Sequence, residues 1–148
     1  MSTPTPTFGT QVIGQTEKAL NAILDRQLEG TGLTEPQWVA LTLAVMSEGT
    51  IEKAAFSGRV ADALKIDDAQ AAAVIAELSA ANLLDLPGAA GAPVRPSDNG
   101  RQLHARVRGA VAGITERLWG DLPSEDLTVA GRVLGTVLQR ANAELARA

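Results

Sequence analysis

Residues 58–86, GRVADALKIDDAQAAAVIAELSAANLLDL, decide the fold of this chain. Their apolar residues recur at the three- and four-residue spacing of helices, first in a short helix and then in a longer one. Lys65-Ile66 allows only a tight connection between the two, and Asp67-Asp68 caps the second because carboxylates suit the positive end of a helix. Ile51–Phe56, just upstream, predicts a further short helix, with Ser57-Gly58 as a point of interruption. The whole stretch predicts a helix–turn–helix.

A small β-hairpin is predicted directly after the second helix. Leu83–Leu86 has the pattern of its first strand, and Val94-Arg95 that of the return strand. Pro87–Pro93 consists of chain breakers and predicts the turn between the strands. Pro96 has no N–H to donate, which limits the return strand to a sheet edge.

Two helices are predicted before this unit. Residues 1–9 are rich in Ser, Thr and Pro and predict a flexible tail or a short arm. The first helix runs from a candidate N-cap at Thr10 to Glu29. The second begins with Thr34-Glu-Pro-Gln37, which has the spacing of a capping box, and ends at Gly49.

Two long helices are predicted after the hairpin. Ser97 caps the first, which runs to about Trp119, and Ser124 caps the second after a break at Gly120–Pro123. Each carries an apolar stripe, namely Leu103, Val107, Val111, Ile114 and Leu118 in the first, and Leu127, Ala130, Leu134, Val137, Ala141 and Leu145 in the second, with coiled-coil-like spacing. These stripes are wider than the central unit can cover, which predicts a two-fold dimer. The alternative is that the terminal helices pack on one another in a monomer.

Composition excludes several classes of protein. The 148 residues contain no cysteine, so a disulfide framework, a thiolate metal site and a cysteine nucleophile are all excluded. Apolar runs are far shorter than the roughly 20 residues that span a bilayer. Met1–Thr10 lacks the basic start and apolar centre of a signal peptide, so we expect a cytoplasmic protein. With a single histidine and no Gly-x-Ser-x-Gly elbow, we expect no enzyme, no metal and no cofactor.

The order of elements resembles that of MarR-type (multiple antibiotic resistance regulator) winged-helix proteins. Four stretches are similar to parts of that family: Leu33–Leu41, Gly58–Ile66, Ile75–Leu84 and Val94–Gly100. The resemblance implies a mainly α fold, a winged helix–turn–helix with a small β-hairpin wing and long dimerisation helices at both ends. It places the winged helix–turn–helix at residues 34–96 within a single domain at 10–148, with dimerisation helices at 10–30 and 97–148.

The resemblance also implies a function. The homodimer would dock two recognition helices in successive major grooves of promoter DNA, about 34 Å apart, and a small-molecule effector would release it. The implied DNA contacts are Ala69, Gln70, Ala72 and Ala73 on the recognition helix, Arg95 on the wing, and Lys53, Arg59 and Lys65 as phosphate partners. The resemblance would place Trp38 and Trp119 on the helices that border the crevice for such an effector, and core packing is the alternative that we favour for Trp38.

The charge distribution departs from that pattern. Residues 50–100 contain four basic and seven acidic residues, and the whole chain has a net charge of −4. DNA affinity comes largely from neutralised phosphates. The family usually has Ser, Thr and Arg where this chain has alanines, and Pro87–Pro93 carries no charge. The alternative function is therefore a winged-helix dimer that does not bind DNA and serves as a ligand-binding or protein-interaction module.

His104 is the only histidine. It shares a helix face with Arg101 and Arg108, which would suit a phosphate contact or a pH-sensitive patch. The alternative, which we expect, is a solvated helix face.

Overall fold

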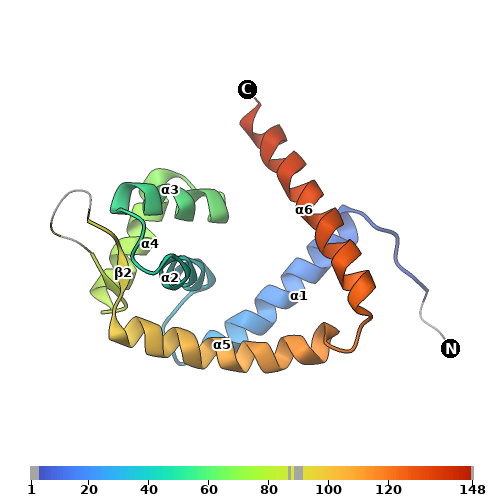
Figure 1. Ribbon diagram of the computed structural model, residues 1–148, viewed down its shortest axis with the longest axis horizontal. Helices are drawn as coiled ribbons and strands as arrows, with labels where there is room; N and C mark the ends of the chain where they lie inside the picture. The colour runs from blue at the N-terminus through green and yellow to red at the C-terminus, as the bar shows by residue number, and fades with distance from the viewer. Residues whose placement is uncertain (1–3, 87, 89–91, 148) are drawn as a thin grey trace. The chain divides into compact units, whose positions relative to one another are not determined.

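The computed structural model describes residues 4–86, 88 and 92–147. The elements in chain order are α1 (Thr10–Leu28), α2 (Glu35–Ser47), α3 (Lys53–Leu64), α4 (Asp68–Ala80), β1 (Leu84–Asp85), β2 (Arg95–Pro96), α5 (Asp98–Trp119) and α6 (Ser124–Ala146) (Figure 1). The chain divides into two compact units, residues 1–111 and 112–148, with the boundary inside α5. The predicted fold class, a mainly α winged helix–turn–helix with a small hairpin, is confirmed.

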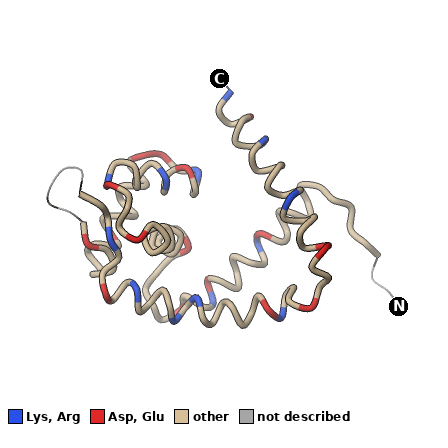
Figure 2. The backbone as a smooth tube through the Cα atoms, in the orientation of Figure 1, with Lys and Arg blue, Asp and Glu red and all other residues tan. Residues whose placement is uncertain are grey.

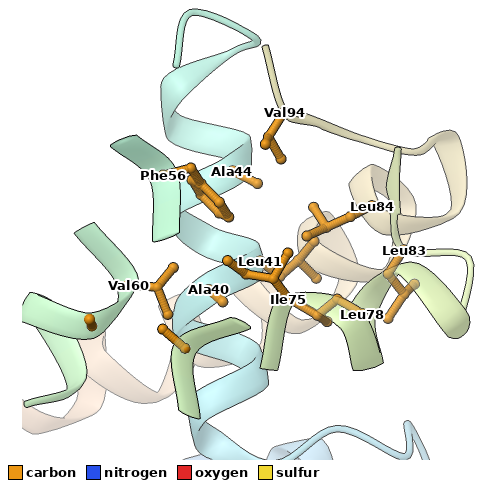
Figure 3. Close-up of a cluster of buried hydrophobic side chains, with 12 residues drawn as sticks. Ala40, Leu41, Ala44, Phe56, Val60, Ile75, Leu78, Leu83, Leu84 and Val94 are labelled. Atoms are coloured by element: carbon orange, nitrogen blue, oxygen red, sulfur yellow. The ribbon is translucent and has the colours of Figure 1, made fainter. Parts of the chain in front are cut away.

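The core of the first unit lies between α2, α3, α4 and the hairpin. Leu41 of α2 and Ile75 of α4 lie at its centre, and Phe56 of α3 packs beside Ala44 (Figure 3). Val94, just before β2, closes the cluster from the wing side. Leu41, Phe56 and Ile75 are each at most 1% exposed, and burial of such a side chain contributes about 1.5–3 kcal/mol. This core holds α4 against α2 and α3 along one face only.

Local capping sets the start of α2 and α5, as predicted. Gln37 N donates to Thr34 Oγ1 at 3.4 Å, and Thr34 N donates to Gln37 Oε1 at 3.0 Å, which completes the capping box. Ser97 Oγ accepts from Gly100 N at 3.0 Å and donates to the carbonyl of Asn82 at 2.6 Å. Ser97 therefore caps α5 and also ties its first turn to the end of the helix–turn–helix.

Two predicted caps are wrong by one residue. Gly9 and Pro123, not Thr10 and Ser124, occupy the N-cap positions of α1 and α6, and neither end has a side-chain capping bond. Both helices start one residue earlier than the sequence pattern predicted. A side chain caps a helix from the residue before the first helical residue, so the hydroxyls of Thr10 and Ser124, at the first helical position, do not occupy the capping site.

The segment before the helix–turn–helix also differs from prediction. Ile51 is not helical: its carbonyl accepts from Val94 N at 2.8 Å, and Glu52 forms an isolated antiparallel bridge with Pro93. The helix then runs from Lys53 to Leu64 without interruption at Ser57-Gly58. Gly58 is tolerated because it lies on the exposed side of α3, where an added Cβ would meet nothing within 4 Å.

The wing is a two-stranded antiparallel sheet. Leu84 lies opposite Pro96 and Asp85 opposite Arg95. The first strand is shorter than the predicted Leu83–Leu86, and the return strand begins one residue later than predicted, at Arg95, and includes Pro96. Part of the predicted turn, Pro87 and residues 89–91, lies outside the described residues, as do residues 1–3 of the predicted tail.

The N-terminal end of α5 approaches this sheet very closely. A Cβ on Gly100 would lie 2.1 Å from the backbone oxygen of Leu83. Only glycine fits at such a contact, because any side chain would overlap the backbone. Gly100 therefore sets the distance between α5 and the start of the wing.

The second unit contains the end of α5 and the whole of α6. Of residues 124–146, all of which the structure describes, none is buried. Leu134, Val137 and Leu145 of the predicted stripe are 46%, 39% and 71% exposed. Across the described ranges, no helix has the length and apolar character needed to cross a membrane.

Candidate nucleic-acid interface

The outer face of α4 holds the four residues predicted to face DNA bases. Ala71, Ile75 and Leu78 form the buried side of the helix. Ala69, Gln70, Ala72 and Ala73 are all exposed on the opposite side. The structure therefore brings the four together on one accessible helical surface. We call this surface the α4 outer face.

Gln70 has a structural role that sequence reasoning missed. Asp67 Oδ1 accepts from Gln70 N at 2.7 Å, and Gln70 Oε1 accepts from Asp67 N at 3.0 Å, a second capping box. A bidentate contact with adenine uses the oxygen and the nitrogen of the amide together. Such a contact would require Gln70 Oε1 to share or give up its capping bond. The Asp-x-x-Gln spacing was the signal in the sequence.

The acidic residues around α4 are partly committed to the fold. Asp67 caps the helix, and Glu77 Oε2 accepts from Gln37 Nε2 at 2.7 Å, which links α4 to the first turn of α2. Asp68 lies in the first turn, where its negative charge interacts favourably with the positive end of the helix dipole. These carboxylates stabilise local structure and at the same time place negative charge along α4, which carries no basic residue.

Basic residues frame the unit from α3 and the wing. Lys53 begins α3, Arg59 lies in its middle and Lys65 follows its end, and all three side chains are exposed. Figure 2 shows basic and acidic residues interspersed along this unit. Lys65 Nζ lies 3.2 Å from Asp62 Oδ1, an exposed pair of the kind that contributes little to stability.

Arg95 lies along the root of the wing. A Cβ on Gly49 would be 2.7 Å from Arg95 Nη1, so the guanidinium lies directly against the residue that follows the C-cap of α2. This contact joins a strand residue to a turn 46 positions earlier, and no local sequence pattern indicated it. Arg95 is exposed and remains available to a partner in solution.

We expected His104 to lie on a solvated helix face, and this prediction is wrong. It is 4% exposed, and its imidazole stacks on the indole of Trp38 with ring centroids 4.8 Å apart and planes 15° from parallel. Burial lowers the pKa of His104 below 6.5, and the positive charge of Arg108 lowers it further. The signal in the sequence was the spacing, since His104 lies four residues after Gly100 and three before Val107, both buried.

The two tryptophans predicted to border a ligand crevice belong to different units. Trp38 is half-buried in the first unit, where it stacks on His104. Trp119, in the second unit, is the last residue of α5 and is 41% exposed. Trp38 thus contributes to packing between α2 and α5, whereas Trp119 offers an open aromatic surface.

Comparison with known proteins finds similarity at the level of structure. No protein-family model and no curated protein matches the sequence. A MarR protein from Peptoclostridium difficile superposes with a TM-score of 0.76 at 18% identity, covering 97% of this chain and 95% of its own. The transcriptional regulator SlyA gives a TM-score of 0.76 at 16% identity, covering 90% of this chain and 94% of its own.

A mycobacterial relative in structure was solved with DNA. The MarR family protein Rv2887 of Mycobacterium tuberculosis, in complex with DNA, has a TM-score of 0.66 at 20% identity, covering 89% of this chain and 98% of its own. The same protein in complex with p-aminosalicylic acid also has a TM-score of 0.66, covering 86% of this chain and 95% of its own. The chain thus has the winged-helix fold of the MarR and SlyA transcriptional regulators, as its sequence resemblance predicted.

Proposed function

We propose that this chain is a cytoplasmic, homodimeric transcriptional regulator that binds promoter DNA through its winged helix–turn–helix. The observation that carries the proposal is the α4 outer face. Ala71, Ile75 and Leu78 hold α4 on the core from behind, which leaves a rigid helix surface open to a major groove. The mycobacterial neighbour solved with DNA has the same fold.

The proposed contacts follow from side-chain chemistry. Ala69, Ala72 and Ala73 present methyl groups that suit the C5-methyl of thymine, and Gln70 is the polar reader among them. Lys53, Arg59, Lys65 and Arg95 are the proposed phosphate and wing contacts. Because α4 itself carries no basic residue, affinity has to come from α3 and the wing.

Dimerisation is proposed from the exposed stripe of α6. Leu134, Val137 and Leu145 repeat along a helix that buries none of its own residues. Apolar residues at alternating three- and four-residue spacing are stabilised by a second helix packed against them. A second copy of the chain supplies such a helix and gives the two recognition helices that a two-fold operator needs.

Release by a small aromatic effector is the regulatory part of the proposal. Trp119 offers an exposed indole, and Trp38 is a half-buried indole at the start of α2 that stacks on His104. Aromatic rings of this kind bind planar ligands by offset stacking. The p-aminosalicylic acid complex of the mycobacterial neighbour supports an effector of that class.

The test is fluorescence-anisotropy binding to the DNA upstream of the chain's own gene, with a scrambled duplex as control, over a series of salt concentrations. Specific binding that weakens with salt, with a slope of several phosphates, supports the regulator. A folded protein that binds neither duplex even at low salt contradicts it.

A second candidate function is favoured by the charge of α4. Asp67 and Asp68 stand at its start, Glu77 lies further along, and no basic residue offsets them on the helix. This acidity suits a dimer that does not bind DNA and serves as a ligand-binding or protein-interaction module. Absence of DNA binding together with saturable binding of an aromatic acid, measured by tryptophan quenching, would favour this second function.

A further inference from the structure

Arg95, at the start of β2, and Gly49 are in close contact. A Cβ on Gly49 would lie 2.7 Å from Nη1, 2.8 Å from Cζ and 3.2 Å from Cγ of Arg95. The side chain therefore lies along residue 49 from its stem to its guanidinium, and any other residue there would displace it. Gly49 also has a φ of 74°, which glycine adopts without strain.

The C-terminal end of α2 provides a favourable electrostatic environment for the guanidinium of Arg95. The last turn of α2 contains no basic residue, and Glu48 follows it as the C-cap. The carbonyl groups at a helix C-terminus carry partial negative charge and favour a nearby cation. Arg95, arriving from the wing, provides that cation beside Gly49.

The backbone on both sides of the contact is held in place. Arg95 pairs with Asp85 in the wing sheet, and its neighbour Val94 donates from its N–H to the carbonyl of Ile51 at 2.8 Å. Glu52, the N-cap of α3, bridges to Pro93. The backbone that carries Arg95 is therefore tied to the turn between α2 and α3, from which the helix–turn–helix begins.

We propose that Gly49 is a positioning residue, because its missing side chain leaves room for the Arg95 guanidinium beside the turn between α2 and α3, where it can bind a DNA backbone phosphate. The inference rests on the proposed DNA-binding function and deepens it. A guanidinium that is already ordered loses less side-chain entropy on binding than a mobile one. Its planar donors then contact phosphate oxygens in a bidentate manner. Residues 50–100 contain only four basic residues, so one pre-ordered arginine has a large share of the affinity.

The experiment compares Gly49→Ala with Gly30→Ala. Gly30 has a φ of 82°, so alanine is strained there to a similar degree, but an added Cβ would meet nothing within 4 Å. Only Gly49→Ala displaces Arg95. Gly49→Asn serves as a second variant, because asparagine tolerates positive φ better than alanine while still bringing a Cβ.

Two readouts are measured on each variant. The first is the NMR order parameter of the Arg95 Nε–H group in the free protein, with the signal assigned by its loss in Arg95→Lys. This order parameter should be high in wild type and in Gly30→Ala, and low in both Gly49 variants. The second is anisotropy of the upstream duplex over a salt series. Gly49→Ala should weaken binding about tenfold and reduce the salt slope by about one, as Arg95→Ala does. In the Arg95→Ala background, Gly49→Ala should have no further effect.

The failures of the inference and of the proposed function are distinguishable. If wild type binds DNA but Gly49→Ala and Gly30→Ala lose equal affinity, or if the Gly49 effect persists without Arg95, the positioning role is overturned and the function stands. A mobile Arg95 in the free wild-type protein also overturns the positioning role. If the wild-type protein shows no salt-dependent DNA binding, the proposed function fails and this inference fails with it.

Discussion

Trp38 and His104 stack face to face, 4.8 Å between ring centroids and 15° from parallel, and so join the start of α2 to the first half of α5. The imidazole is 4% exposed, which makes a charged ring costly at that place. Arg101, three residues earlier on α5, pairs with Asp98 at 3.6 Å, and Arg108 lies one turn later. The stack is therefore most stable with a neutral histidine.

Acid should weaken the fold through His104. The pKa of His104 is lowered by burial and by Arg108 in the folded state, whereas the unfolded chain titrates near 6.5. The unfolded state binds the proton more readily, so stability is full above pH 6.5 and falls as the pH drops below it. We expect a lower Tm at pH 5 than at pH 7.5, with a smaller difference in His104→Gln.

The same titration can be followed locally. In a Trp119→Phe background, Trp38 is the only tryptophan left, and its emission should change over the same pH interval as the single histidine signal in NMR. A Trp38 emission that is constant from pH 7.5 to pH 5, or a Tm profile that His104→Gln leaves unchanged, would contradict the role given to the stack.

Gly100→Ala should destabilise the protein by about 1–3 kcal/mol, the usual cost of overpacking. A Cβ there would be 2.1 Å from the backbone oxygen of Leu83, and backbone cannot move aside as a flexible side chain can. The control is Gly109→Ala on the same helix, where an added Cβ meets nothing within 4 Å. That substitution should be neutral or stabilise by up to about 1 kcal/mol through helix propensity. Urea denaturation measures both, and equal effects would refute the close contact.

Ala72→Glu should reduce DNA affinity by at least about tenfold without a change in Tm. Ala72 is exposed on the α4 outer face, so a carboxylate there costs the fold little but repels phosphates. Ala105→Glu, an exposed alanine of α5, adds the same charge away from α4 and serves as the control. Anisotropy with the upstream duplex separates the two, and an equal loss from both variants would mean that net charge alone controls binding.

Leu134→Glu should convert the proposed dimer into a folded monomer. Leu134 is 46% exposed in the single chain and lies in the middle of the α6 stripe, where a charge would be buried by a partner helix. Gln139→Glu, five residues later and on the opposite side of the helix, should leave the dimer intact. Light scattering after size exclusion measures the mass and circular dichroism the helix content. A wild-type protein that is already a monomer would disprove the dimer.

Much of the helix–turn–helix could be predicted because its signals are local. Thr34 and Gln37 close a capping box within four residues, and Ala71, Ile75 and Leu78 lie on one face at helical spacing. From these patterns alone, the order of elements and the exposure of the α4 outer face follow. The caps at Thr10 and Ser124 were missed because the start of a helix can shift by one residue at little cost.

Several contacts in and around the candidate site join residues that are far apart in the sequence, so only the tertiary structure determined them. Ile51 lies outside the helix, and its carbonyl accepts a hydrogen bond from the N–H of Val94, more than 40 residues away in the sequence. Gly49 likewise meets Arg95, since folding brings the wing root over the end of α2. His104 lies near Arg101 and Arg108 along its own helix, as a surface residue would, but in the folded chain it is buried and stacks on the indole of Trp38 from a second helix. Sequence spacing determines which side of an element is apolar, whereas the packing of elements determines what that side meets.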